Sequence, residues 1–187
     1  MNVVTVIGVL VLVAIVVIAA AWWFTQQRRR SKQLRQQFGP EYERAVDEYG
    51  ERGRAEQALA ARAERVEQLH IRPLSAEDSA RYAEEWRSVQ SRFVDAPEDA
   101  IGDADRLCGE VMQARGYPMG DFEQRAADIS VDHPQVVEHY RAAHAVARRS
   151  ADGNAATEDL RQAMVHYRTL FEDLIERREP AHAERTR

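Results

Sequence analysis

The chain has one cysteine and one lysine among its 187 residues. A single thiol, Cys108, cannot form an internal disulfide, which excludes a disulfide-stapled scaffold and suits a reducing compartment. Cys108 follows Leu107 and precedes Val111 on an apolar helical pattern. We therefore interpret it as a small buried hydrophobic residue rather than a reactive thiol.

Motifs of catalytic and ligand-binding sites are missing as well. The sequence has no Gly-rich phosphate loop, no GxSxG elbow, no HExxH and no paired-cysteine zinc pattern. No two histidines have the i,i+4 spacing of a helical zinc site. We interpret the six histidines as partly buried structural residues: His70, His133, His139, His144, His166 and His182. The sequence predicts no catalytic residue, cofactor or metal site, and we expect a non-enzymatic protein.

Charged side chains are absent between Val3 and Phe24. At about 1.5 Å per helical residue, these roughly 22 residues reach about 33 Å, enough to cross a hydrocarbon core of about 30 Å. A single segment in lipid can satisfy its backbone only as a helix. The run predicts one transmembrane helix. Gly8 is its only glycine, so a small-residue dimerisation face is not indicated.

Two other interpretations of this run are a cleaved signal peptide and a buried core segment of a soluble domain. A signal peptide has basic residues before a short apolar stretch and small residues at its cleavage site. Here no Lys or Arg precedes the run, and it ends in Trp22, Trp23 and Phe24. Residues 19–21 are only a weak match to a cleavage site. The length and flanking charges favour the transmembrane interpretation.

A basic cluster follows the apolar run at once, and we call it the collar: Arg28, Arg29, Arg30 and Lys32. The positive-inside rule predicts that the N-terminus lies outside and the C-terminal part in the cytoplasm, at the inner membrane. Trp22 and Trp23 then lie at the inner headgroup level. We interpret the collar as a topology signal. The alternatives are specific contact with anionic lipid and an extracytoplasmic domain held by an uncleaved signal anchor.

Net charge separates the collar from the rest of the chain. The whole chain carries −5, and residues 28–35 contribute five positive charges and no acid, so the remainder carries −10. An acidic domain lacks the basic surface that displaces counterions from nucleic acid. We expect the lipid bilayer as one partner, a protein or a second copy of the chain as another, and no nucleic acid.

Strand signals and internal repeats are absent, so we expect an all-α fold. It comprises a transmembrane anchor (1–25), a basic collar with a charged helical stalk (26–72), a small antiparallel helical bundle (73–178) and a flexible tail (179–187). Sparse apolar positions in residues 40–70 predict a poorly buried helix that breaks near Gly50 and Gly53. A short coiled-coil seam is the alternative there.

Capping signals divide the bundle into helices. Ser75 and Asp95 are predicted N-caps, and Asp132, before His133 and Pro134, is a third. The last helix carries the widest apolar face, from Leu160 to Ile175, which includes a stripe from Tyr167 to Ile175. We expect any exposed part of that stripe and the 40–70 helix to be the contact surfaces for a partner.

One loop-rich zone, residues 115–133, is the only place where we would expect a pocket. It brings several ionisable residues together in sequence: Arg115, Glu123, Arg125, Asp128, Asp132 and His133. We interpret them as caps and local ion pairs. The alternative function, a ligand-sensing or enzymatic helical bundle, would have its site here.

Four segments look familiar: RQQFGPEYERAV (35–46), RFVDAPEDAIGDADRL (92–107), RGYPMGDFEQRAADISVDHPQVVEHYRAAH (115–144) and TEDLRQAMVHYRTLF (157–171). They resemble a group of short, uncharacterised single-span membrane proteins from GC-rich bacteria. The resemblance implies a membrane protein with no assigned activity and supplies no catalytic residues. We therefore expect a membrane-tethered protein-interaction or scaffolding module at the inner face of the cell membrane.

Overall fold

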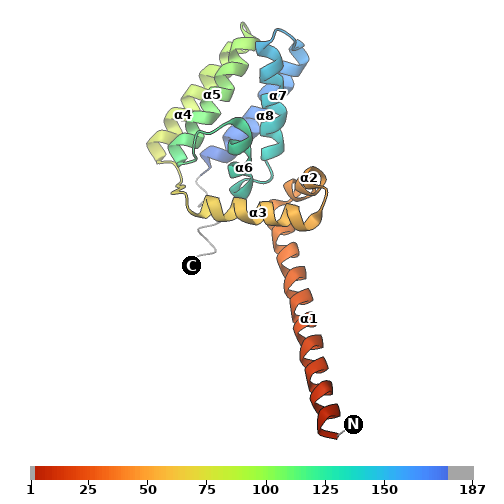
Figure 1. The fold of residues 1–187 in the computed structure, drawn as a ribbon. Helices are drawn as coiled ribbons and strands as arrows, with labels where there is room; N and C mark the ends of the chain where they lie inside the picture. The colour runs from red at the N-terminus through yellow and green to blue at the C-terminus, as the bar shows by residue number, and fades with distance from the viewer. Residues whose placement is uncertain (1–2, 177–187) are drawn as a thin grey trace.

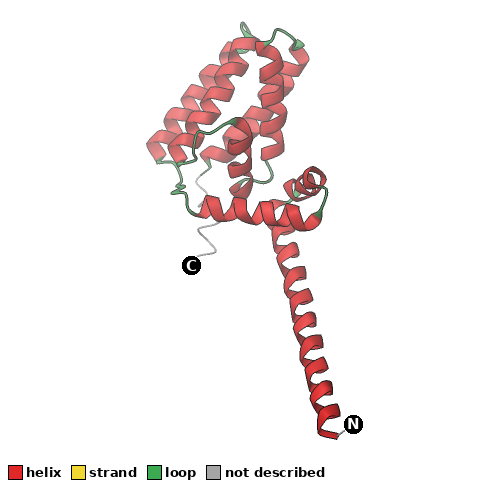
Figure 2. Cartoon of the chain, in the orientation of Figure 1, coloured by secondary structure: helices red, strands yellow, loops and turns green. Residues whose placement is uncertain are grey.

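The computed structural model describes residues 3–176, except the side chains of residues 3–11, 13 and 14. Within that range the chain is all α-helical, with eight helices and no strand (Figures 1 and 2). The helices are α1 (Val3–Phe38), α2 (Pro40–Tyr49), α3 (Arg52–Glu67), α4 (Ala76–Arg92), α5 (Pro97–Arg115), α6 (Phe122–Asp132), α7 (Val137–Ala151) and α8 (Thr157–Ile175). The predicted all-α fold and helical bundle are confirmed. The predicted tail, residues 179–187, lies outside the described residues.

Helix α1 is an unbroken helix of 36 residues that projects from the folded part as a shaft (Figure 1). It ends at Phe38 because Gly39 has a φ of +49°, which favours glycine, and Pro40 starts the next helix. Leu34 and Phe38 are buried. The shaft is therefore fixed to the folded part through its last two turns.

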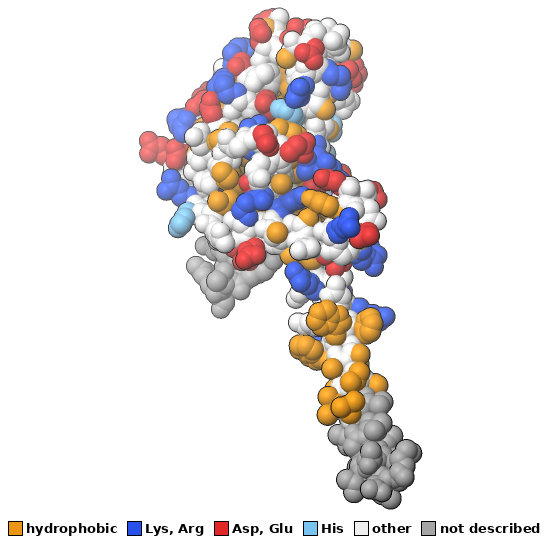
Figure 3. All heavy atoms as spheres, in the orientation of Figure 1, with side chains coloured by type: hydrophobic (Ala, Val, Ile, Leu, Met, Phe, Trp, Pro, Cys, Tyr) orange, Lys and Arg blue, Asp and Glu red, His pale blue; other side chains and the backbone are white. Residues whose placement is uncertain are grey.

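Among the described residues, no helix is both long enough and apolar enough to cross a membrane. Much of the predicted span, at residues 3–11, 13 and 14, lies outside the described side chains. The large apolar side chains that are described between Leu12 and Phe24 are 59–68% exposed. Figure 3 shows them as an orange band on the shaft.

Two antiparallel hairpins, α4–α5 and α7–α8, form the bundle (Figure 1). Trp86 of α4 stacks on Phe171 of α8 with ring centroids 4.7 Å apart, which joins the hairpins. Cys108 is buried in α5, and burial raises the pKa of its thiol well above the usual range. Its interpretation as a small core residue is confirmed.

The predicted contact stripe at the end of α8 lies in this core. Tyr167, Leu170, Phe171 and Leu174 are at most 1% exposed. The neighbouring helices cover these four residues, so they are not an exposed part of the stripe. The expectation that an exposed part contacts a partner stays a prediction.

Local capping signals have mixed outcomes. Ser75 accepts a hydrogen bond from the backbone N–H of Asp78 at 3.0 Å, as predicted. Asp95 is not a cap, because Pro97 is the first helical residue and Ala96 immediately before it takes the N-cap position. Asp132 is not a cap either. Helix α6 continues through Asp132, and Pro134 disfavours helical geometry at His133, so α7 starts only at Val137.

Residues 40–70 are less exposed than predicted. They form a helical hairpin, α2–α3, that breaks at Gly50 as expected. Ala55, Leu59 and Val66 of α3 are completely buried, because α3 lies against α6 and the end of α1. A narrow apolar stripe therefore suffices to attach this hairpin to the bundle. The predicted domain boundary near residue 72 stays a prediction.

Candidate functional site

The zone around residues 115–133 does bring buried ionisable groups together. Arg115, the last residue of α5, is completely buried although it carries a charge. Its Nη1 lies 3.0 Å from the carbonyl oxygen of Leu174 and 3.1 Å from Nε2 of His133. The other ring nitrogen of His133, Nδ1, contacts a carboxylate oxygen of Asp173 in α8. We call Arg115, His133 and Asp173 the clamp.

The chemistry of Arg115 assigns the hydrogen positions in the clamp. A guanidinium has only donors, so Nε2 of His133 must accept from Arg115. The neutral ring then carries its hydrogen on Nδ1 and donates it to Asp173. Both nitrogens of His133 are therefore engaged, and neither is left to take a proton from a substrate. The clamp joins α5, the α6–α7 turn and the last turn of α8.

Tyr117 extends the clamp to Asp132. The Tyr117 hydroxyl donates to a carboxylate oxygen of Asp132 at 2.9 Å. Burial raises the pKa of Tyr117 well above its usual range, and the charge of Asp132 adds to the increase. This hydroxyl therefore remains a donor at neutral pH. Asp132 was expected to cap α7, and it instead orients a buried tyrosine 15 positions earlier.

A second set of buried charges connects the α2–α3 hairpin to α6 and α7, and we call it the seam. Glu41 of α2 is 1% exposed, and its Oε1 accepts from Arg141 of α7 at 2.8 Å and from Arg62 of α3 at 3.2 Å. Arg62 also donates to Ser130 of α6. Asp128 of α6 accepts from Arg65 of α3 and from Gln124. The seam thus pairs most of its charges across helices.

The expectation of local pairs in this zone holds only in part. Asp128 pairs with Arg65, 63 positions away, and His133 pairs with Asp173, 40 positions away. Glu123 accepts from Arg141, and Arg125 donates to the hydroxyl of Tyr140. No sequence pattern predicts Glu41 or Asp173 as members of these clusters. In the sequence, Glu41 looks like an ordinary acid in the first turn of a helix, and Asp173 looks like a surface residue.

Three further histidines contact one another or a carboxylate. The Nδ1 atoms of His139 (α7) and His166 (α8) lie 2.8 Å apart, so one donates and the other accepts. Burial, and then the neighbouring His139 ring, lower the pKa of His166. His144 stacks on Phe122 with centroids 3.8 Å apart and lies 3.3 Å from Asp105. Among the described residues, no three His, Cys, Asp or Glu side chains gather in a way that could hold a metal ion.

Asp105 receives two hydrogen bonds between the hairpins. Burial alone would raise the pKa of Asp105, but hydrogen bonds with His144 and Tyr167 outweigh burial and lower it. Burial, and then the Asp105 charge, raise the pKa of Tyr167 above its usual range. This carboxylate is therefore an ionised acceptor that fixes α5 to α7 and α8. Its lowered pKa does not suit a proton donor near neutral pH.

The surface beside the zone has one open hollow of about 510 Å³. Its walls include Asp121, Glu123, Arg141, His144 and Arg148. Glu123 and Arg141 pair with each other at 2.8 Å, and His144 contacts Asp105. An enclosed pocket with several unpaired ionisable groups was the feature that would favour a ligand site. This hollow is open and most of its charges are paired.

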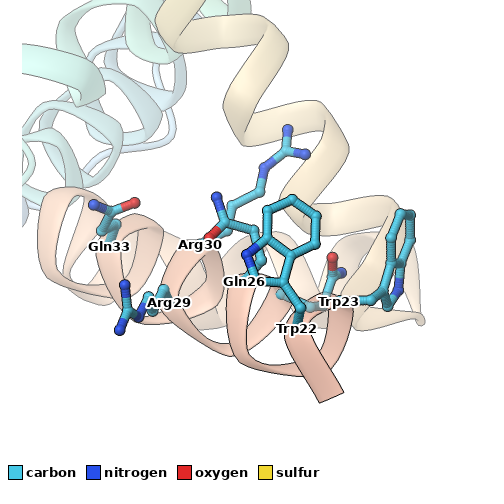
Figure 4. A pocket seen from close by; sticks show the side chains of 7 residues that line it. Trp22, Trp23, Gln26, Arg29, Arg30 and Gln33 are labelled. Atoms are coloured by element: carbon cyan, nitrogen blue, oxygen red, sulfur yellow. The ribbon is translucent and has the colours of Figure 1, made fainter. Parts of the chain in front are cut away.

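The residues predicted at the membrane interface lie along α1. Trp22 and Trp23 are each 67% exposed, and all four collar residues are exposed. Figure 4 shows Arg30 extending from α1 toward the ribbon of α3, with the two indole rings at the lower end of the same region. The structure places these residues on the shaft, before the buried residues Leu34 and Phe38 that attach it to the folded part.

Comparison with known proteins adds no assignment. No family model matches the chain, and no curated protein and no solved structure match it. The resemblance to single-span bacterial proteins therefore stays a prediction.

Proposed function

We propose that this protein is a membrane-tethered, non-enzymatic helical module at the inner face of the cell membrane, with α1 as a single anchor. The observation that carries the proposal is the shaft itself. Its large apolar side chains from Leu12 to Phe24 are 59–68% exposed, which is costly in water. The uncharged sequence continues back to Val3. Lipid would cover this surface.

Charge supports the orientation. The collar follows the apolar segment directly, whereas the first acid of the chain is Glu41. Moving four cations across a bilayer is unfavourable, so the collar side stays in the cytoplasm. The acidic remainder would be weakly repelled by an anionic leaflet, which would hold the bundle away from the surface.

A non-enzymatic role is supported by the way the buried charges are used. His133 has both ring nitrogens engaged, Asp105 accepts two hydrogen bonds, and the seam pairs Glu41 and Asp128 with arginines. Each of these groups accepts or donates a hydrogen bond to a neighbouring helix, which supports a structural role. The ligand-sensing alternative would have to use the open hollow beside Glu123 and Arg148.

A protein partner or a second copy of the chain remains part of the proposal. Proximity labelling from the C-terminus in intact cells should recover a discrete neighbour or the chain itself, and should label cytoplasmic proteins. A solitary chain, or labelling only on the outer side, would contradict the proposal.

Alkaline carbonate extraction of membranes tests the anchor. We expect the wild-type chain to stay in the pellet. Ile15→Arg with Ile18→Arg should move it to the supernatant, because each arginine at a helix centre costs about 2.5–3.5 kcal/mol. Val94→Arg is the matched control, since Val94 is an exposed apolar residue of the bundle at 83% exposure. Release of the wild-type chain by carbonate would overturn the proposal.

A further inference from the structure

Within the part of the chain that the structure describes, the collar cations have no acidic partner. Among the described residues, none of Arg28, Arg29, Arg30 and Lys32 forms an ion pair, whereas Arg35, one turn further on, pairs with Glu43 at 2.6 Å. Most arginines of the bundle are paired in the same way. The collar therefore offers free positive charge that the folded part does not neutralise.

One face of α1 arranges this charge beside aromatic rings. Trp22, Gln26, Arg29 and Gln33 follow at intervals of four, three and four, so they share one side of the helix. They line a hollow of about 590 Å³ together with Trp23 and Arg30 (Figure 4). Its lining combines guanidinium and amide donors with indole rings and includes no acid. That composition suits a phosphate ester attached to an apolar chain.

Helix α3 forms a second hollow with α1 at the level of Arg30. A hollow of about 330 Å³, which we call the crook, lies between Gln27 and Arg30 of α1 and Gly53 and Gln57 of α3. Arg30 lines both hollows. The acid in the lining, Glu56, is 4% exposed and accepts the hydroxyl of Tyr42 at 2.7 Å. One of its carboxylate oxygens is therefore engaged by Tyr42 of α2.

Distance along the shaft places the crook at the outer edge of the lipid headgroup layer, where a long arginine side chain can reach back toward the phosphates. Arg30 lies six residues beyond Phe24, which is about 9 Å along a helix. The headgroup region extends about 5–8 Å beyond the hydrocarbon core on each side. Helix α3 crosses the upper end of α1 (Figure 1). With α1 along the membrane normal, α3 would lie along the bilayer surface with the crook facing the headgroups.

We propose that the collar and the first two turns of α3 together bind the phosphate of an anionic phospholipid headgroup, with Arg30 shared by the two hollows. The inference rests on the proposed membrane anchor and adds a defined ligand class to it. Binding across two helices would hold α3, and with it the bundle, in a fixed orientation relative to the bilayer.

Quenching of tryptophan fluorescence by brominated lipid tests the proposal. The full chain is reconstituted in vesicles of phosphatidylcholine with a minority of phosphatidylglycerol, and one of the two lipids is brominated. We expect brominated phosphatidylglycerol to quench more than brominated phosphatidylcholine at equal mole fraction. The quenching should correspond to an enrichment of about fivefold for each cation engaged. Equal quenching by the two lipids would overturn the inference.

Variants separate the two-helix site from the collar alone. Gln57→Glu places an acid in the crook without changing the collar, and Arg30→Gln removes the shared cation. Both should reduce the enrichment. Gln90→Glu, on α4, makes the same charge change far from the shaft and should not. A loss in Arg30→Gln with no loss in Gln57→Glu would show that the collar acts alone, and would overturn the two-helix site.

Two further measurements identify the source of the phosphate and distinguish a failure of this inference from a failure of the membrane anchor. Inorganic phosphate at constant ionic strength should leave the enrichment unchanged. If it abolishes the enrichment, the site binds free phosphate and the lipid assignment is wrong. Retention by pure phosphatidylcholine vesicles in carbonate is measured in parallel. A chain that is retained but shows no lipid preference refutes only this inference, whereas a chain that is washed off refutes the anchor.

Discussion

Arg115 can only donate hydrogen bonds, and at the scale of single residues this property determines the hydrogen positions around it. Because its guanidinium donates to Nε2 of His133, the histidine must donate from Nδ1 to Asp173. The guanidinium also donates to the carbonyl of Leu174 in the last turn of α8, where the helix dipole favours a cation. Nη1 of the buried Arg115 thus contacts a ring nitrogen and a helix end, whereas Nε and Nη2 have no hydrogen-bond partner among the described residues.

Gly116 is the residue whose replacement the backbone tolerates least. It has a φ of +100°, and a Cβ there would lie 2.7 Å from the carbonyl oxygen of His70. We expect Gly116→Ala to lower the free energy of unfolding by about 1–3 kcal/mol. Gly102→Ala in the same helix meets nothing within 4 Å. It should raise the free energy of unfolding by about 0.5–1 kcal/mol.

Chemical denaturation of the full chain in detergent micelles measures both variants. Similar stabilities for Gly116→Ala and Gly102→Ala would mean that the chain can move away from His70 at little cost, and that α5 does not require a left-handed residue at its end.

At the scale of helices, the seam adds buried charge pairs to the apolar stripe that attaches the α2–α3 hairpin to the bundle. Glu41 is its central acceptor. We expect Glu41→Gln to weaken the attachment by about 1.5–3 kcal/mol, the usual worth of a hydrogen bond to a charged group. Hydrogen exchange should then become faster in α2 and α3 while α8 stays protected.

Glu43→Gln on the same helix is the control for this change. Glu43 pairs with Arg35 but is 59% exposed, so its loss should alter exchange in α2 and α3 very little. Uniformly faster exchange in α8 as well would indicate that the hairpin and the bundle unfold as one unit. Such a result would contradict the prediction that the α2–α3 hairpin opens independently of the bundle.

Local signals predicted the helices well and their contacts poorly. Gly50 and Ser75 mark helix ends because their effect depends only on neighbouring backbone. Asp132 was misread, since its partner Tyr117 becomes visible only after the chain folds. Glu41 and Arg141 are 100 positions apart, and no spacing rule relates them. The zone of residues 115–133 does contain buried ionisable groups, but their pairings are tertiary.

At the scale of the whole molecule, the His139–His166 pair makes stability depend on pH. Burial and the neighbouring ring lower the pKa of His166 below its ordinary value of 6.5. Between the lowered pKa and 6.5 the unfolded chain binds more protons than the folded chain, so the free energy of unfolding falls as the pH falls through this window. Both Nδ1 atoms cannot carry a proton at 2.8 Å without repulsion.

Denaturation at several pH values between about pH 7 and about pH 5 measures this dependence. We expect His139→Gln with His166→Gln to lose less stability on acidification than the wild type. His70→Gln, which changes an exposed histidine, should follow the wild type. Parallel curves for the double variant and the wild type would show that the pair does not contribute.

The continuity of α1 has a geometrical consequence. No hinge interrupts the helix between Val3 and Phe38, and Leu34 and Phe38 are locked into the folded part. Rotation of the shaft about its axis must therefore turn everything attached above it by the same angle. One residue added within the shaft would swing the bundle by about 100° and lift it by about 1.5 Å. The number of residues in the shaft therefore determines the direction in which each face of the bundle points around the shaft axis.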